Sequence, residues 1–199
     1  MPQMTWDRLL SSERSRASTR QSRDIRSEFA KDYHRIISSA SFRRLQDKTQ
    51  VFPLDRGDFV RTRLTHSLEV SSFAGSIGDT ALARLAESHP EITPQVRADC
   101  VEILRCAGLI HDIGNPPFGH FGEFTIREWF SDNLPKLSCR GKNAAELLTP
   151  QQCGDLENFE GNAQALRVLT KLHFMVDDNG MNLTFALLNT IIKYPVPST

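Results

Sequence analysis

The sequence predicts a mainly α-helical domain. Apolar residues recur at intervals of three and four through several long segments, which is the spacing of one face of a helix. Glycine and proline clusters separate these segments, and few stretches alternate between apolar and polar residues as a half-buried strand does. With 199 residues, 39% of them hydrophobic, the chain is long enough for one domain with a buried core.

The N-terminal part divides into an arm and the start of the domain. Residues 1–22 are rich in serine and arginine and are predicted to form a mobile basic arm ahead of a single domain over 23–199. Apolar residues near helical spacing then predict a helix over about 24–45. Proline, aspartate and glycine over 52–59 predict a turn or a short hairpin.

Two further helices are predicted over about 62–86 and 94–111. Proline suits the first turn of a helix, so Pro94 marks the start of the second one. Glycine and two prolines after residue 113 end it, because proline cannot continue a helix. The first of these helices is expected to bury apolar side chains that share one face: Leu64, Leu68, Phe73 and Ile77.

The C-terminal part is predicted to hold shorter helices. One is expected over about 120–130, followed by a stretch with little regular structure over 131–157. Helices return over about 160–173 and 183–192. Two prolines follow the last helix and no closing element comes after them, so the helical bundle is predicted to be incomplete at its C-terminus.

Charge and cysteine content narrow the class of protein. Residues 1–63 carry 14 Lys and Arg against 8 Asp and Glu, although the whole chain is formally neutral. This excess indicates either a polyanion near the segment or solvated helix faces that pair with the acidic remainder. The four cysteines form no CxxC pair, no apolar run approaches the roughly 20 residues of a membrane span, and no secretory signal is evident. We therefore expect a cytoplasmic protein that does not enter membranes.

The residues with the clearest chemistry are His66 and the pair His111-Asp112. Imidazole nitrogen together with carboxylate oxygen suits a divalent first-row transition metal such as Mn²⁺, or Mg²⁺ when fewer nitrogens bind. Adjacent side chains on a regular helix point about 100° apart, so both can reach one ion only where the helix ends. The glycine and prolines that follow Asp112 supply such an end.

A second pair, His120 and Glu123, follows the metal candidates in the run LIHDIGNPPFGHFGE. The two residues lie three apart and share a face on a helix. Histidine titrates near neutral pH, so His120 is a candidate for proton transfer. The alternatives are a helix cap for His120 and a first-turn partner of the helix dipole for Glu123.

These motifs together resemble the dGTPase family, within the HD-domain phosphohydrolases. The resemblance covers nearly the whole chain from residue 24 and is carried by DYHRIISSASFRRLQDKTQVFPL, FVRTRLTHSLEVSS, LIHDIGNPPFGHFGE, FEGNAQALRVLTKL and NLTFALLNTIIKYP. The resemblance implies that this chain is the N-terminal portion of an HD-domain helical bundle.

The resemblance implies metal-dependent hydrolysis of dGTP or another deoxynucleoside triphosphate to the deoxynucleoside and inorganic triphosphate. It assigns His66, His111 and Asp112 as metal ligands and expects a fourth, an aspartate, well downstream of the KYP segment. Because no such aspartate is present, the isolated chain is expected to be weak or inactive as an enzyme. A homo-oligomer is also implied, with nucleic acid as a regulator.

The resemblance and the chemistry of the side chains together assign roles to the remaining candidates. Glu123 would orient His120, Arg63 would clamp phosphate oxygens through its planar fork, and Gln50 would bind the 3′-hydroxyl of the sugar. Asn162 and its neighbour Glu160 either line the substrate site or cap and pack a helix. Phenylalanines of the motifs are expected in the core: Phe42, Phe52, Phe118, Phe121 and Phe124.

Two other functions stay open at this point. One is a different HD hydrolase, such as a nucleoside monophosphate phosphatase or an alarmone hydrolase, which would release orthophosphate or pyrophosphate. The other is a non-catalytic remnant that oligomerises or binds nucleic acid through the basic arm. Product analysis separates the enzymes from each other, and the missing fourth ligand is what favours the non-catalytic alternative.

Overall fold

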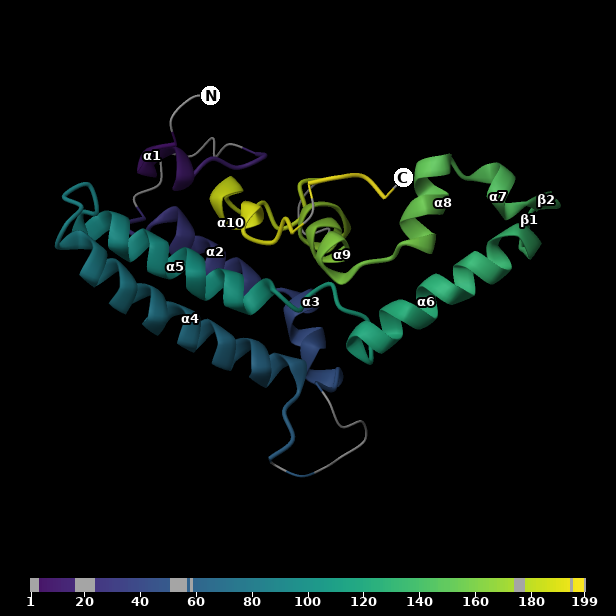
Figure 1. The fold of residues 1–199 in the computed structure, drawn as a ribbon, viewed down its shortest axis with the longest axis horizontal. Coiled ribbons are helices and arrows are strands. Elements are labelled where there is room, and N and C mark those ends of the chain that lie inside the picture. Colours follow the sequence, from purple (N-terminus) through teal and green to yellow (C-terminus); the bar gives the residue numbers. More distant parts are fainter. Residues whose placement is uncertain are drawn as a thin grey trace.

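The computed structural model describes residues 4–16, 24–50, 57, 59–173, 178–193 and 195–198. Within this part of the chain the fold is mainly helical, as predicted (Figure 1). The one sheet in it has two short antiparallel strands, β1 (Ser138–Cys139) and β2 (Lys142–Asn143). The turn predicted over 52–59 falls almost wholly outside the described residues.

Two long helices, α4 (Arg63–Ala86) and α5 (Pro94–Ile110), lie side by side and run antiparallel (Figure 1). Thr62 and Thr93 cap their N-termini, each accepting a hydrogen bond from a backbone N–H of the first turn. Small residues let the helices approach closely: a Cβ added at Gly108 would lie 2.6 Å from Ser71 Cα. The bounds of both helices match the predicted ranges.

The face that α4 turns inward differs from the prediction. Leu68, Phe73 and Ile77 are 44%, 66% and 69% exposed. The buried face instead carries Ser67 and Ser71 with the glycines of the same helix, because only small side chains fit between two backbones at this distance. The expectation of a buried apolar face on α4 was wrong for these three residues. Leu64, the fourth residue predicted on this face, does pack against the core.

The segment predicted as one helix over 24–45 is broken. It forms α2 (Glu28–Ile37), α3 (Ala40–Arg43) and the 3₁₀ turn η1 (Arg44–Asp47). The break lies at Ser39, whose backbone is extended and whose side chain accepts a hydrogen bond from Phe42 N. Serine competes with the helix through such local bonds, and here it starts a new helix.

Residues 131–157 hold more regular structure than predicted. Thr149 and Gln152 form a reciprocal capping box, and Pro150 occupies the first turn, so the sequence does contain a start signal for α8. The C-terminal elements are α6 (Gly119–Asn133), η2 (Leu134–Lys136), α7 (Ala144–Leu147), α8 (Pro150–Glu157), α9 (Gly161–Arg167), the π-helical turn η3 (Val168–Leu172) and α10 (Phe185–Asn189). The helices predicted over 120–130, 160–173 and 183–192 are thus present.

The main core lies between α2, α5, α9 and α10. Its fully buried side chains include Ile36 of α2, Leu109 and Ile110 of α5 and Leu187 of α10. Phe42 belongs to this core as predicted, but Phe118, Phe121 and Phe124 are more than half exposed. These three lie at the start of α6, which projects away from the core helices in Figure 1. Phe52 falls outside the described residues.

The described part of the N-terminal arm, 4–16, contacts the domain. A short helix, α1 (Trp6–Leu9), precedes a backbone bridge between Arg14 and Thr184. The Arg14 guanidinium pairs with Asp32, which is fully buried, and with Glu28. Residues 13–16 are therefore joined to α2 and to the residues before α10, whereas 17–22 lie outside the described part.

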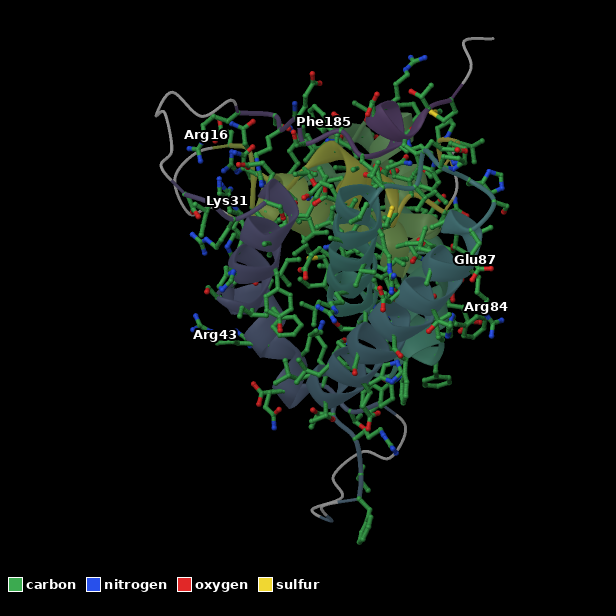
Figure 2. All side chains as sticks on the ribbon, turned by 90° about the vertical axis from the view of Figure 1, so that its left-hand side faces the viewer. Arg16, Lys31, Arg43, Arg84, Glu87 and Phe185 are labelled. Atoms are coloured by element: carbon green, nitrogen blue, oxygen red, sulfur yellow. The ribbon has the colours of Figure 1, made fainter. Side chains whose placement is uncertain are left out.

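Basic side chains of the N-terminal third gather on one edge of the molecule, where Figure 2 shows Arg16, Lys31 and Arg43. Several of these cations pair within the same third rather than with the acidic remainder: Arg14 and Lys31 both contact Glu28. The excess of positive charge is thus only partly neutralised by local carboxylates.

Candidate metal centre

The His-Asp pair lies where α5 ends, as its sequence context predicted. Leu109 and Ile110 are fully buried, so the last turn of α5 is anchored in the core. His111 is the C-cap residue and Asp112 follows in a turn. His66 lies in the first turn of α4, and because the two helices are antiparallel, this turn lies beside the end of α5.

The structure brings the three predicted metal ligands together. One ligand atom from each of His66, His111 and Asp112 lies within 4.8 Å of the other two. The imidazole rings of the two histidines have centroids 5.2 Å apart at an angle of 67°. The histidines are partly exposed and Asp112 is buried, so one side of the group stays open to solvent.

The orientation of the His111 ring suits metal binding. Its Nδ1 lies 2.8 Å from the carbonyl oxygen of Gly108. Since a carbonyl only accepts, Nδ1 carries the proton and donates, which leaves the lone pair on Nε2 available to a metal. A hydrogen bond from the ring nitrogen that does not bind the metal is the usual way in which a metal-binding histidine is oriented.

Two donors hold the Asp112 carboxylate. Arg63 Nη1 donates to Oδ2 at 2.7 Å, and Asn115 Nδ2 donates to Oδ1 at 2.6 Å. Both Arg63 and Asp112 are buried, and Arg63 Nε has no hydrogen-bond partner among the described residues. Arg63 was predicted as a phosphate clamp; here it donates to the carboxylate of the candidate ligand Asp112, with Nε still free to donate.

The residues fit a divalent cation. Two nitrogens and one carboxylate oxygen form a mixed donor set that suits a first-row transition metal, and three protein ligands leave positions for water or substrate oxygens. The carboxylate is held in place by donors and retains further lone pairs. Sequence reasoning missed Asn115 as one of these donors, although its position three residues after Asp112 was a usable signal.

The pair His120 and Glu123 is not formed in the structure. His120 is exposed in the first turn of α6, whereas Glu123 is buried. Glu123 Oε1 accepts a hydrogen bond from Gly161 N at 2.8 Å, at the N-terminus of α9, and its Oε2 lies 3.9 Å from Arg127 Nη2. No hydrogen bond or ion pair joins Glu123 to His120 in this arrangement, so Glu123 here connects α6 to α9.

Gln50 and Asn162 differ in how they relate to the site. Gln50 precedes α4, and its Oε1 is buried without a partner among the described residues, which leaves it available to a hydroxyl donor. Asn162 donates to Glu160, and the Glu160 side chain caps α9 through Ala163 N. Asn162 also lines a cavity of about 450 Å³ together with Arg127 and Lys193. Glu160 thus caps α9, and both Glu160 and Asn162 line this cavity, which contains none of the candidate metal ligands.

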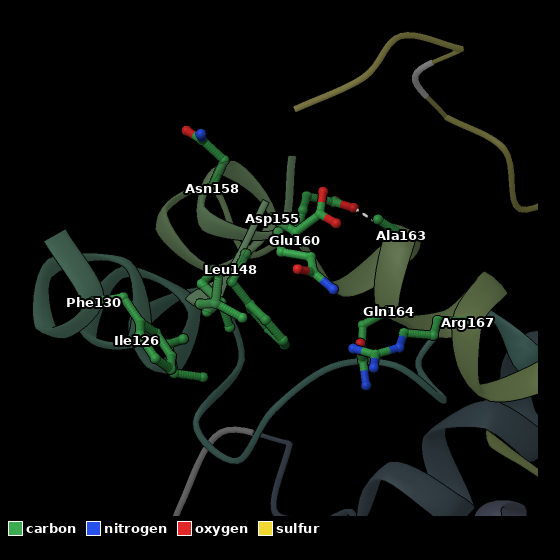
Figure 3. Close-up of a pocket in the computed structure, with 12 residues that line it drawn as sticks. Ile126, Phe130, Leu148, Asp155, Asn158, Glu160, Ala163, Gln164 and Arg167 are labelled. Atoms are coloured by element: carbon green, nitrogen blue, oxygen red, sulfur yellow. Dashed lines mark hydrogen bonds between the residues drawn. The ribbon is translucent and has the colours of Figure 1, made fainter. Parts of the chain in front are cut away.

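A cavity of about 820 Å³ lies between α6, α8 and α9 (Figure 3). Its lining is mostly apolar, with Ile126 and Phe130 on one side and Gln164 and Arg167 on the other. None of the three candidate metal ligands lines it. The sequence did not indicate this cavity because α8, which forms one wall, was predicted as loop.

Comparison with known proteins identifies the segment that carries these ligands. The profile of the HD domain family matches residues 63–148, a range that includes His66, His111 and Asp112. This segment is therefore similar to HD domains. The predicted resemblance to HD domains is therefore confirmed for this segment, and its three candidate ligands lie together in the structure.

Relatives of the whole chain support the same assignment. A deoxyguanosinetriphosphate triphosphohydrolase-like protein of Listeria monocytogenes is 56% identical over 98% of this chain, and one of Synechocystis is 44% identical over 96%. A deoxyguanosinetriphosphate triphosphohydrolase of Serratia proteamaculans is 38% identical over 88%. The chain spans less than half of each relative, 43%, 43% and 38% of their lengths. No helix in the described ranges is long and apolar enough to cross a membrane.

Proposed function

We propose that this chain provides the metal-binding part of an active site that hydrolyses deoxynucleoside triphosphates to deoxynucleoside and inorganic triphosphate. The observation that carries the proposal is the cluster of His66, His111 and Asp112 at the open end of the α4–α5 pair. The names of the similar proteins, which cover nearly the whole chain, favour dGTP or a related substrate.

A divalent ion bound there, Mn²⁺, Mg²⁺ or another transition metal, would polarise a phosphate oxygen and lower the pKa of a bound water. The chain's own residues would orient the substrate. Arg63 has an unsatisfied Nε–H beside the cluster, and Gln50 has an unsatisfied carbonyl oxygen. The first can donate to a phosphate oxygen and the second can accept from a sugar hydroxyl.

His120 is the proposed proton-transfer residue. It is exposed, and it follows His111 by nine residues across a rigid glycine-proline turn. A histidine in this position can take a proton from the attacking water or give one to the leaving oxygen. We propose that Glu123 acts on it only after a rearrangement, since its carboxylate now bonds to Gly161. Homo-oligomer formation and regulation by nucleic acid stay predictions from the sequence.

Metal binding is the first test. The 199-residue chain should bind one Mn²⁺ weakly in an electron paramagnetic resonance titration. His111→Ala and Asp112→Ala should each abolish this binding, whereas His89→Ala, which removes an exposed histidine paired only with Glu91, should not change it. Equal binding by all four proteins would refute the assignment of the ligands.

Turnover and product identity are the second test. A hybrid in which this chain replaces the aligned part of the Listeria monocytogenes relative should release tripolyphosphate from dGTP, as measured by ³¹P NMR. Orthophosphate or pyrophosphate would indicate a different HD hydrolase, and no turnover with Mn²⁺ bound would favour a non-catalytic role. In this hybrid His120→Ala should lower kcat by roughly 10²–10⁴-fold without altering Mn²⁺ affinity. Full activity of the variant would show that His120 only begins a helix.

A further inference from the structure

Lys48, which follows η1, contacts both residues that hold Asp112. Its backbone carbonyl accepts a hydrogen bond from Arg63 N at 2.9 Å, and its ammonium Nζ donates to the carbonyl oxygen of Asn115 at 2.8 Å. Arg63 and Asn115 in turn donate to the two oxygens of Asp112. The four residues therefore close a ring of hydrogen bonds around the metal-ligand carboxylate.

The ammonium of Lys48 lies in surroundings that disfavour a positive charge. It is half-buried, and it forms no ion pair with a carboxylate among the described residues. Burial lowers the pKa of Lys48, and the neighbouring charges of Arg63 and Arg44 lower it as well, against the attraction of Asp112. Desolvating a cation costs free energy unless hydrogen bonds compensate. The hydrogen bond to the Asn115 carbonyl supplies such compensation.

Asn115 lies in the irregular turn between α5 and α6, where its backbone N–H donates to the carbonyl oxygen of Asp112 at 3.2 Å. Lys48 holds its carbonyl from one side. From the other side its side-chain oxygen lies against Gly161, where an added Cβ would come within 2.1 Å of Asn115 Oδ1. The side-chain amide is thereby directed at Asp112.

We propose that Lys48 is a positioning residue of the metal centre: by holding the Asn115 carbonyl, it keeps the Asn115 amide on Asp112 and presents this carboxylate to a metal ion. This inference rests on the proposed function only in taking Asp112 as a metal ligand. The hydrogen-bond ring itself can be tested without metal.

The first measurement uses the metal-free 199-residue chain. The ¹⁵N NMR signal of the Asn115 side-chain amide, identified by its loss in Asn115→Ala, should exchange slowly with solvent. Lys48→Met should speed this exchange toward that of an exposed amide, and Lys48→Arg, which keeps a cationic donor, should restore protection. Lys142→Met removes an exposed lysine on β2, at the far end of α6 in Figure 1, and should have no effect. Lys48→Gln, too short to reach the carbonyl, serves if Lys48→Met does not fold.

The second measurement is Mn²⁺ affinity. Loss of a residue that orients a ligand typically weakens metal binding by about 10–100-fold, and we expect about 10-fold for Lys48→Met. Asn115→Ala should weaken it at least as much. If Lys48 acts through Asn115, adding Lys48→Met to Asn115→Ala should cause no further loss.

The outcomes separate this inference from the proposed function. An Asn115 amide that exchanges equally slowly in Lys48→Met overturns the positioning role, as does a full additional loss of affinity in the double variant. A chain that binds no Mn²⁺, while Lys48→Met still exposes the amide, refutes the metal site and leaves the hydrogen-bond ring intact.

Discussion

Arg63→Met is predicted to destabilise the chain through the buried ion pair with Asp112. The side chains of Arg63 and Asp112 are only 5% and 8% exposed, and their charged atoms lie 2.7 Å apart. Removing one partner of a buried pair leaves an uncompensated charge and costs about 3–5 kcal/mol. Because Asn115 still donates to the carboxylate, we expect the lower end, about 3 kcal/mol. For a domain of this size that lowers Tm by about 6–12 °C.

The assay is thermal unfolding in metal-free buffer, with a matched control. Arg97 forms an ion pair with Asp79 at a similar distance, 2.6 Å, but their side chains are 38% and 51% exposed. Arg97→Met should therefore leave Tm almost unchanged, since exposed pairs contribute little. Arg63→Met combined with Asp112→Ala should recover part of the loss, because neither charge is then buried.

The result that would refute this reasoning is an equal change of Tm in Arg63→Met and Arg97→Met. Burial of the first pair would then have no energetic consequence, and water would have to reach Asp112 freely. A double variant less stable than Arg63→Met by the full effect of Asp112→Ala would also contradict it, since the two side chains would act independently.

Two further predictions concern Gly161 and His173. Gly161→Ala would place a Cβ 2.1 Å from Asn115 Oδ1. It should therefore cost about 1–3 kcal/mol of stability, measured by unfolding, and weaken Mn²⁺ binding, measured by titration. Unchanged Mn²⁺ affinity would contradict the role of Asn115. Burial lowers the pKa of His173 from 6.5, so the unfolded chain binds more protons in acid and stability should fall as pH drops below about 6.5. His173→Gln should make that fall shallower, and an identical pH profile would contradict it.

Elements with strong local signals were predictable from the sequence. α4 and α5 were predicted within one or two residues because apolar residues recur at helical spacing along both and Pro94 suits the first turn of α5. The break at Ser39 and the helix α8 were missed, although serine and the capping box of Thr149 are local signals too. Apolar periodicity over 24–45 favoured one continuous helix, and the polar composition of 131–157 favoured loop.

The orientation of helices was less predictable than their existence. Apolar periodicity placed Phe73 and Ile77 inward, but α4 approaches α5 through serine and glycine, and the large side chains lie outside. Periodicity identifies an apolar face without showing what packs against it. The close approach of two backbones selects small residues, and that choice depends on the partner helix.

The sequence by itself determined which residues can bind a metal. His111 and Asp112 are adjacent at a helix end, and their chemistry together with that of His66 is evident without a fold. Only the tertiary structure decided what holds them. Arg63 lies 49 residues before its partner Asp112, and Lys48 lies 67 residues before its partner Asn115. Such distant residues meet only because the fold brings the start of α4 beside the end of α5. The approach of the start of α9 to α6 likewise places Gly161 N, and not His120, on the Glu123 carboxylate. The donor chemistry of a side chain is a local property of the chain, whereas its hydrogen-bond partners across the fold are chosen by packing.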